Sequence, residues 1–89
     1  MTTINVTAAH IASGERNNCM CCPVALAIAD TFPGVGVWVG GATALIDADG
    51  HDTEADLPVE VEEFVLRFDD DGFGDPFAFE LDYPKAAAA

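Results

Sequence analysis

The sequence predicts an α+β protein, with a small, mostly antiparallel sheet and two helices packed on one face of it. Two segments, around residues 25–32 and 61–68, carry apolar residues at helical spacing. A glycine pair, Gly40-Gly41, separates two apolar runs as in a β-hairpin, and residues 77–83 alternate between large apolar residues and small or acidic ones. We therefore expect the order β-α-β-β-α-β in one domain over residues 1–85.

The first residues predict a strand and a single helical turn. Residues 3–6 alternate, and Thr7 is expected to cap a turn over Ala8–Ser13 that Gly14 closes. The first strand either lies beside the last one, as in split β-α-β folds, or sits at an edge. Residues 86–89 are an alanine tail without a core signal and a candidate cloning remnant.

The most apolar helix is expected to begin at Pro23, with Cys22 as its N-cap, because proline is tolerated at the first helical position. Pro33-Gly34 should end it. Its side chains are apolar most of the way round, so it should be buried on several sides. Either a sheet and a second subunit bury it, or loops of its own chain do. The stripe at helical spacing consists of Ala25, Ile28, Ala29 and Phe32.

The middle of the chain predicts a hairpin followed by an acidic segment. Residues 35–39 and 42–46 are the two expected strands, and residues 47–56 are rich in acids and turn formers, with an optional short strand near Thr53. Pro58 should open the second helix. Its apolar face is Val61, Phe64, Val65 and Phe68, with Glu60, Glu62, Glu63 and Arg67 opposite.

The charge of the chain is strongly lopsided. The net charge is −13, and residues 47–89 hold 14 of the 16 acids with two basic residues, a net charge of −12. Such a field repels nucleic acid and anionic membranes and attracts basic partners. We expect an acidic face that binds a basic surface of another protein. Acidity for solubility or for high salt is the alternative. The predicted face comprises Asp47, Asp49, Asp52, Glu54, Asp69, Asp70 and Asp71.

The three cysteines of the chain, Cys19, Cys21 and Cys22, are clustered in one short segment, which is the chemically unusual part of the sequence. Cys22 at a helix start should have a lowered thiol pKa, unless it is simply a small buried hydrophobe. Cys19 and Cys22 are spaced as half a zinc site, with His10 as a third candidate, but zinc needs four ligands. We therefore expect no cofactor, with zinc or a redox dithiol as alternatives.

Enzymatic motifs are missing from the sequence. It has no phosphate-binding glycine loop and no nucleophile elbow. The segment Asp47-Ala48-Asp49-Gly50 suggests a calcium loop, but that alignment puts Leu45 at the first ligand position. No apolar run reaches membrane-spanning length and the N-terminus lacks signal-peptide features, so we expect a cytoplasmic, non-enzymatic protein with no catalytic residues.

Several short motifs together resemble a known group of proteins. They are His10-Ile11-x-x-Gly14-Glu15-Arg16, Cys19-x-x-Cys22-Pro23-Val24-Ala25-Leu26-Ala27, Leu57-Pro58, Phe64…Phe68-Asp69 and Pro76-Phe77-x-Phe79-Glu80-Leu81. This pattern resembles small uncharacterised proteins of actinobacteriophages and their hosts, over most of residues 4–83. The resemblance implies a phage accessory protein in the host cytoplasm and implies no activity. Cys21 and the acidic segment 47–56 depart from the group.

The function that these observations favour is a small, non-enzymatic protein-binding module that uses its acidic half. Two alternatives remain. One is a zinc- or thiol-dependent protein centred on Cys19 and Cys22. The other is a structural homo-oligomer, such as a homodimer, that uses the apolar helix or Trp38 as its interface.

Overall fold

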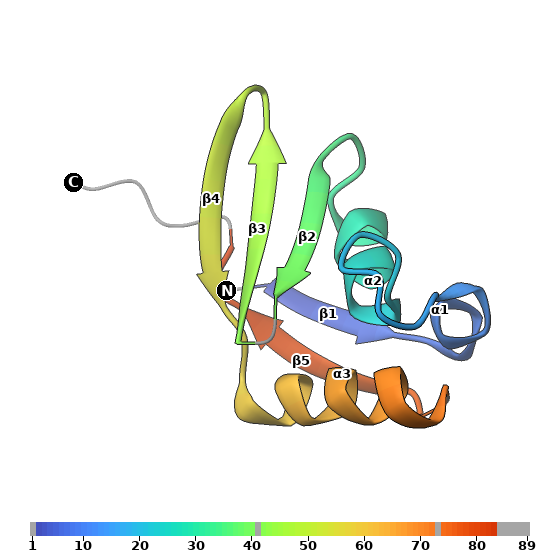
Figure 1. The fold of residues 1–89 in the computed structure, drawn as a ribbon. Coiled ribbons are helices and arrows are strands. Elements are labelled where there is room, and N and C mark those ends of the chain that lie inside the picture. The colour runs from blue at the N-terminus through green and yellow to red at the C-terminus, as the bar shows by residue number, and fades with distance from the viewer. Residues whose placement is uncertain (1, 41, 73, 84–89) are drawn as a thin grey trace.

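The fold is α+β, as the sequence predicts (Figure 1). The computed structural model describes residues 2–40, 42–72 and 74–83. The element order is β-α-α-β-β-β-α-β, with one more strand than expected and the short N-terminal turn as a helix. The elements are β1 (Thr2–Val6), α1 (Ala8–Ser13), α2 (Pro23–Thr31), β2 (Gly36–Gly40), β3 (Thr43–Ala48), β4 (His51–Asp56), α3 (Val59–Asp71) and β5 (Phe77–Leu81).

The strands form two sheets, so the expected single sheet with both helices on one face is wrong. β1 and β5 pair antiparallel as a ribbon, and β2, β3 and β4 form an antiparallel meander. The free edge of β2 has no room for a fourth strand, because the backbone N–H of Val39 donates to the carbonyl of Cys19 at 2.8 Å. The terminal strands therefore pair with each other, with Ile4 opposite Phe79. Figure 1 places α2 on the β1 side of this ribbon and α3 on the β5 side.

The segment 47–56 is a hairpin rather than a turn-rich loop. β3 runs on to Ala48, which pairs with His51 across a two-residue connection. Asp49 and Gly50 have φ angles of 54° and 79°, as a type I′ turn requires at both central positions. In the β2–β3 connection, Gly40 is the last residue of β2, opposite Thr43, and Gly41 of the predicted turn lies outside the described residues.

The helices α1 and α2 begin directly after the capping residues that the sequence predicts. Thr7 caps α1 and accepts from the backbone N–H of His10, and Cys22 caps α2 with Pro23 at the first turn. Five of the nine residues of α2 are buried within this chain. In α3, Pro58 is the N-cap rather than the first helical residue.

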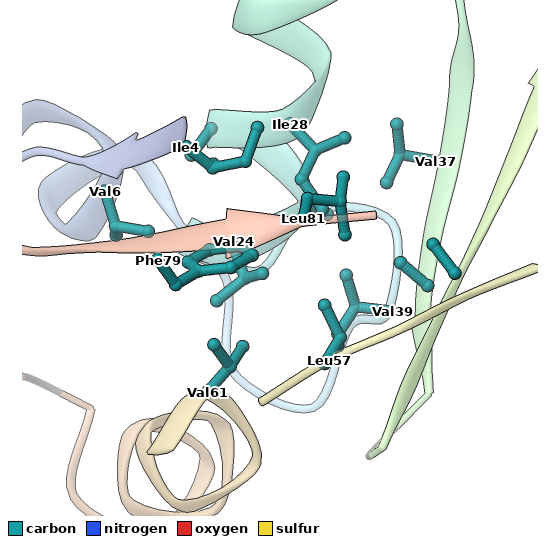
Figure 2. Packing of buried hydrophobic residues seen from close by; sticks show 14 of the residues in the cluster. Ile4, Val6, Val24, Ile28, Val37, Val39, Leu57, Val61, Phe79 and Leu81 are labelled. Atoms are coloured by element: carbon teal, nitrogen blue, oxygen red, sulfur yellow. The ribbon is translucent and has the colours of Figure 1, made fainter. Parts of the chain in front are cut away.

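The core is continuous between the two sheets and the two longer helices. Figure 2 shows its side chains converging from every layer. On α3, Val61 and Phe68 are buried and Phe64 and Val65 are partly buried, as the periodicity predicts. The labelled core residues are Ile4, Val6, Val24, Ile28, Val37, Val39, Leu57, Val61, Phe79 and Leu81.

Candidate functional site

The candidate site is the face of the three-stranded sheet that points away from the core. Side chains alternate across a strand, so burial of one set exposes the other. The inward set is Val37, Val39, Ala44, Ile46 and Ala55. The opposite set, which we call the outer sheet face, comprises Gly36, Trp38, Thr43, Leu45, Asp47, Asp52, Glu54 and Asp56.

The pairing register gathers an apolar centre and an acidic surround on this face. Trp38 of β2 lies opposite Leu45 of β3, and Leu45 lies opposite Glu54 of β4. One row further along the strands, Asp47 lies directly opposite Asp52. Directly opposed side chains on one face are within contact range of each other. The three strands therefore place an indole, a leucine and three carboxylates on one continuous surface.

The indole of Trp38 lies along its own strand over Gly36. A Cβ atom added at Gly36 would sit 3.0 Å from Cη2 and 3.1 Å from Cζ3 of the indole, and 3.7 Å from Cβ of Asp47. A side chain at position 36 would therefore be tight against the indole, which would have to shift by a few tenths of an ångström. Trp38 is half-buried in this position, and its partner Leu45 is 37% exposed. The apolar centre is thus accessible from solvent and borders Asp47.

Among the residues that the structure describes, no Lys, Arg or His forms an ion pair with a carboxylate of the outer sheet face. No Lys or Arg occurs between Arg16 and Arg67 in the sequence. Within residues 2–40, 42–72 and 74–83, the carboxylate oxygen Oδ1 of Asp47 is buried and accepts no hydrogen bond. Directly opposed like charges such as Asp47 and Asp52 destabilise a sheet by several tenths of a kcal/mol. The fold therefore holds negative charge here that a bound cation would stabilise.

The seven acidic residues that the sequence singled out divide into two groups. Four lie on the β3–β4 hairpin, and three lie in the last turn of α3; Figure 1 shows the hairpin tip and this helix end at opposite sides of the molecule. The hairpin group is Asp47, Asp49, Asp52 and Glu54, and the helix group is Asp69, Asp70 and Asp71.

The helix group has a structural role at the end of α3. The guanidinium of Arg16 donates from Nε to the backbone carbonyl of Asp69 at 3.1 Å and from Nη2 to that of Asp70. The backbone N–H of Asn17 donates to Oδ1 of Asp69 at 2.8 Å. These bonds satisfy carbonyls that a helix end leaves unpaired. This end is therefore tied to the loop after α1 through the backbone carbonyls of Asp69 and Asp70 and the carboxylate of Asp69.

Cys22 is a buried capping residue, and the expectation of a lowered thiol pKa is wrong. Its side chain is 3% exposed, and its Sγ accepts from the backbone N–H of Ala25 at 3.5 Å. Burial raises the pKa of the Cys22 thiol, and this outweighs the lowering by the N–H groups of Ala25 and Val24. Cys19 is exposed and Cys21 is half-buried. The helix start therefore holds an un-ionised thiol.

Among the zinc candidates, His10 is engaged away from the cysteines. Nδ1 of His10 accepts from the backbone N–H of Thr7 at 3.0 Å, so its Nε2 carries the proton and donates to Oδ2 of Asp30 at 2.5 Å. His10 thus belongs to the N-terminal cap of α1 rather than to the cysteine corner. Across the part of the chain that the structure describes, no three His, Cys, Asp or Glu side chains come together as a metal site.

A second, weaker candidate is a groove of about 410 Å³ between α3 and the segment leading into β5. Phe64 and Phe77 form part of its wall, with ring centroids 4.7 Å apart. Its acidic rim residues Glu60, Glu63 and Asp75 stand beside Arg67. Because a cation already lies among these carboxylates, the groove has less unbalanced charge than the outer sheet face.

Sequence reasoning missed the indole at the centre of the site. It treated Trp38 as a strand residue or an oligomer contact, because the partner of a strand is not visible in the sequence. One available signal was Asp49-Gly50, since Asp-Gly between strand-like runs is typical of a two-residue hairpin. With that hairpin in place, alternation alone would have put Asp47, Asp52 and Glu54 on one face.

Comparison of the chain with protein-family models, with curated proteins and with solved structures found no match. The resemblance to actinobacteriophage proteins therefore stays a prediction. In the described part of the chain, none of the helices is long and apolar enough to cross a membrane.

Proposed function

We propose that this protein is a small, non-enzymatic binding module that holds a basic segment of another protein on its outer sheet face. The observation that carries the proposal is the solvent-accessible Trp38–Leu45 pair, which shares its sheet face with carboxylates of β3 and β4 and with no Lys or Arg. If the resemblance to phage accessory proteins holds, the partner is a basic protein of the host.

The chemistry of this face suits a Lys or Arg side chain. The methylene stem of either residue can lie on Trp38 and Leu45 while its charged head reaches Asp47, Asp52 or Glu54. A cation over an exposed indole gains about 0.5–1 kcal/mol. A cation between Asp47 and Asp52 also removes the repulsion between these opposed carboxylates. Several basic residues on one partner would add these small gains.

The competing functions fit the structure less well. The thiol-dependent alternative needs an ionised thiol at Cys22, whereas burial raises the pKa of that thiol. A homo-oligomer through the outer sheet face would bring two acidic surfaces together, which is electrostatically unfavourable.

The single tryptophan of the chain is a direct reporter for this function, because it lies within the proposed face. Trp38 fluorescence would be followed while a heptapeptide of alternating lysine and threonine is added, with a glutamate–threonine peptide as the control. We expect a saturable change with the basic peptide, which weakens as salt screens the exposed charges.

A matched pair of triple variants tests where the peptide binds. The first, D47N/D52N/E54Q, neutralises the outer sheet face. The second, E60Q/E63Q/D75N, removes the same charge at the groove of α3. Three exposed ion pairs at about 0.5 kcal/mol each predict a roughly tenfold weaker affinity for the first variant only. Equal affinity of the two variants would show that net charge, and not this face, attracts the peptide.

A further inference from the structure

β4 is an edge strand with an open side. Within the described residues it pairs with β3 and with no other strand, and Figure 1 shows it at the outside of the three-stranded sheet. The other edge, on β2, is occupied by the bond from the N–H of Val39 to the carbonyl of Cys19. In the described part of the chain, the β4 edge of the sheet is therefore the one with no bonded neighbour.

The ladder shows which backbone groups of β4 face this edge. The N–H of Leu57 donates to the carbonyl of Ala42 at 2.8 Å, so this pair marks the hydrogen-bonded positions. In an antiparallel pair such positions alternate. Thr53 and Ala55 therefore bond to β3, while the remaining residues of the strand direct their N–H and C=O groups outward. These outward residues are Asp52, Glu54 and Asp56.

The same three residues carry the exposed carboxylates of the strand. Asp52, Glu54 and Asp56 are exposed, whereas Ala55 between them is fully buried. Alternate residues of a strand are about 6.8 Å apart. The free edge thus combines a row of unpaired peptide groups with a negative charge beside each of them.

We propose that the β4 edge accepts an extended basic segment as an added antiparallel strand, with Lys or Arg at alternate positions opposite Asp52, Glu54 and Asp56. This inference rests on the proposed function and keeps its basic partner, but the added strand lies beside β4, so its basic side chains reach Asp52, Glu54 and Asp56 rather than Trp38 on β2. The backbone of the segment bonds to the outward N–H and C=O groups of β4. Its basic side chains lie on the outer sheet face next to the carboxylates, and the strand direction sets their spacing.

The charge pattern also selects against a second copy of this chain as the added strand. Two antiparallel β4 edges would bring the three carboxylates of one copy against those of the other. Directly opposed like charges destabilise strand pairing. Charged residues at an edge strand commonly prevent such self-association, and the same charges become favourable when the incoming strand is basic.

Backbone N-methylation of the peptide separates strand addition from side-chain attraction. In the proposed register, the lysine N–H groups of the alternating heptapeptide face β4 and the threonine N–H groups face away. Methylating the lysine N–H groups should weaken binding at least tenfold, as measured by isothermal titration calorimetry. Methylating the threonine N–H groups should change it by less than about threefold, although both peptides keep the same charge.

A matched pair of protein variants tests the same edge. Glu54→Pro removes an outward N–H without removing a bond to β3, because proline is tolerated at such edge positions. Glu54→Gln removes the charge alone. Glu54→Pro should therefore bind the parent peptide more weakly than Glu54→Gln does, with circular dichroism as the check that both variants fold. If Glu54→Pro fails to fold, the two methylated peptides decide the question.

The outcomes distinguish the two proposals. Binding of the parent peptide with equal effects of both methylation patterns would overturn strand addition and leave the proposed function standing. Failure of the parent peptide to bind would overturn both. A concentration-dependent dimer that is lost in Glu54→Pro would show that a second copy occupies the edge, and would also overturn the proposal.

Discussion

Replacing Arg16 with alanine should destabilise the protein although the side chain is exposed. The guanidinium donates to the carbonyls of Asp69 and Asp70 at the end of α3. Its stem also lies over Gly72, because a Cβ atom there would be 3.1 Å from Cδ of Arg16. Arg16 therefore caps the C-terminal end of α3, where Asp69, Asp70 and Asp71 follow one another.

The magnitude follows from these contacts. Two solvent-exposed hydrogen bonds from a charged donor are worth about 0.5 kcal/mol each, less than the values for buried pairs. A cation in the last turn of a helix adds about 0.3–1 kcal/mol. The expected loss for Arg16→Ala is therefore about 1–2 kcal/mol, or roughly 5–15 °C in Tm for a domain of this size.

Thermal unfolding followed by circular dichroism would measure this loss, with Arg67→Ala as the control. Arg67 lies on the same helix and is exposed, and it makes no hydrogen bond or ion pair with the other residues that the structure describes. Both variants remove one positive charge, but only Arg16→Ala removes the cap. Equal losses of Tm in the two variants would refute the capping argument and point to the general cost of added negative charge.

Two further predictions concern the hairpin turn and the buried thiol. Gly50→Ala should lower the free energy of unfolding by about 1–2 kcal/mol, because Gly50 has a φ of 79°. Gly40→Ala is the control and should change it little, since nothing lies within 4 Å of an added Cβ at this position. Similar unfolding midpoints in urea for the two variants would contradict this prediction. Cys22 should react with iodoacetamide much more slowly than the exposed Cys19, as read by mass spectrometry. The pKa of Cys22 is higher in the folded state than in the unfolded state, so the free energy of unfolding should be independent of this thiol below its ordinary pKa and should fall as the pH rises above that value. Cys22→Ser should remove this contribution to the pH dependence.

Local patterns in the sequence were sufficient for the helices and their starts. Thr7 and Cys22 are the N-caps that their residue types and neighbours predict, and the 3.6-residue period placed Val61 and Phe68 in the core. These features depend on residues within one or two turns of each other. The same local reasoning failed for the Cys22 pKa, because desolvation depends on the layers that pack over the helix start.

The candidate site could be predicted only in part. The acidic residues of the hairpin were identified, but they were grouped with Asp69, Asp70 and Asp71 of α3, which lie elsewhere. Charge is visible in composition, whereas a face requires knowing which strands pair and in which register. The contact of Arg16 with the end of α3 spans more than fifty residues, so no local pattern could have indicated it.

The sequence by itself determined the α+β class, the helix periodicities, the caps and the concentration of negative charge after residue 46, because these depend on neighbouring residues and on counting. Tertiary structure decided that the strands form two sheets, that β4 pairs with no strand but β3 within the described residues, and that Trp38 shares a sheet face with Asp47, Asp52 and Glu54. The physical reason is that strand pairing is non-local. The N–H of Val39 at the edge of β2 bonds to the carbonyl of Cys19, and the terminal strands pair with each other although residues 7–76 of the chain separate them.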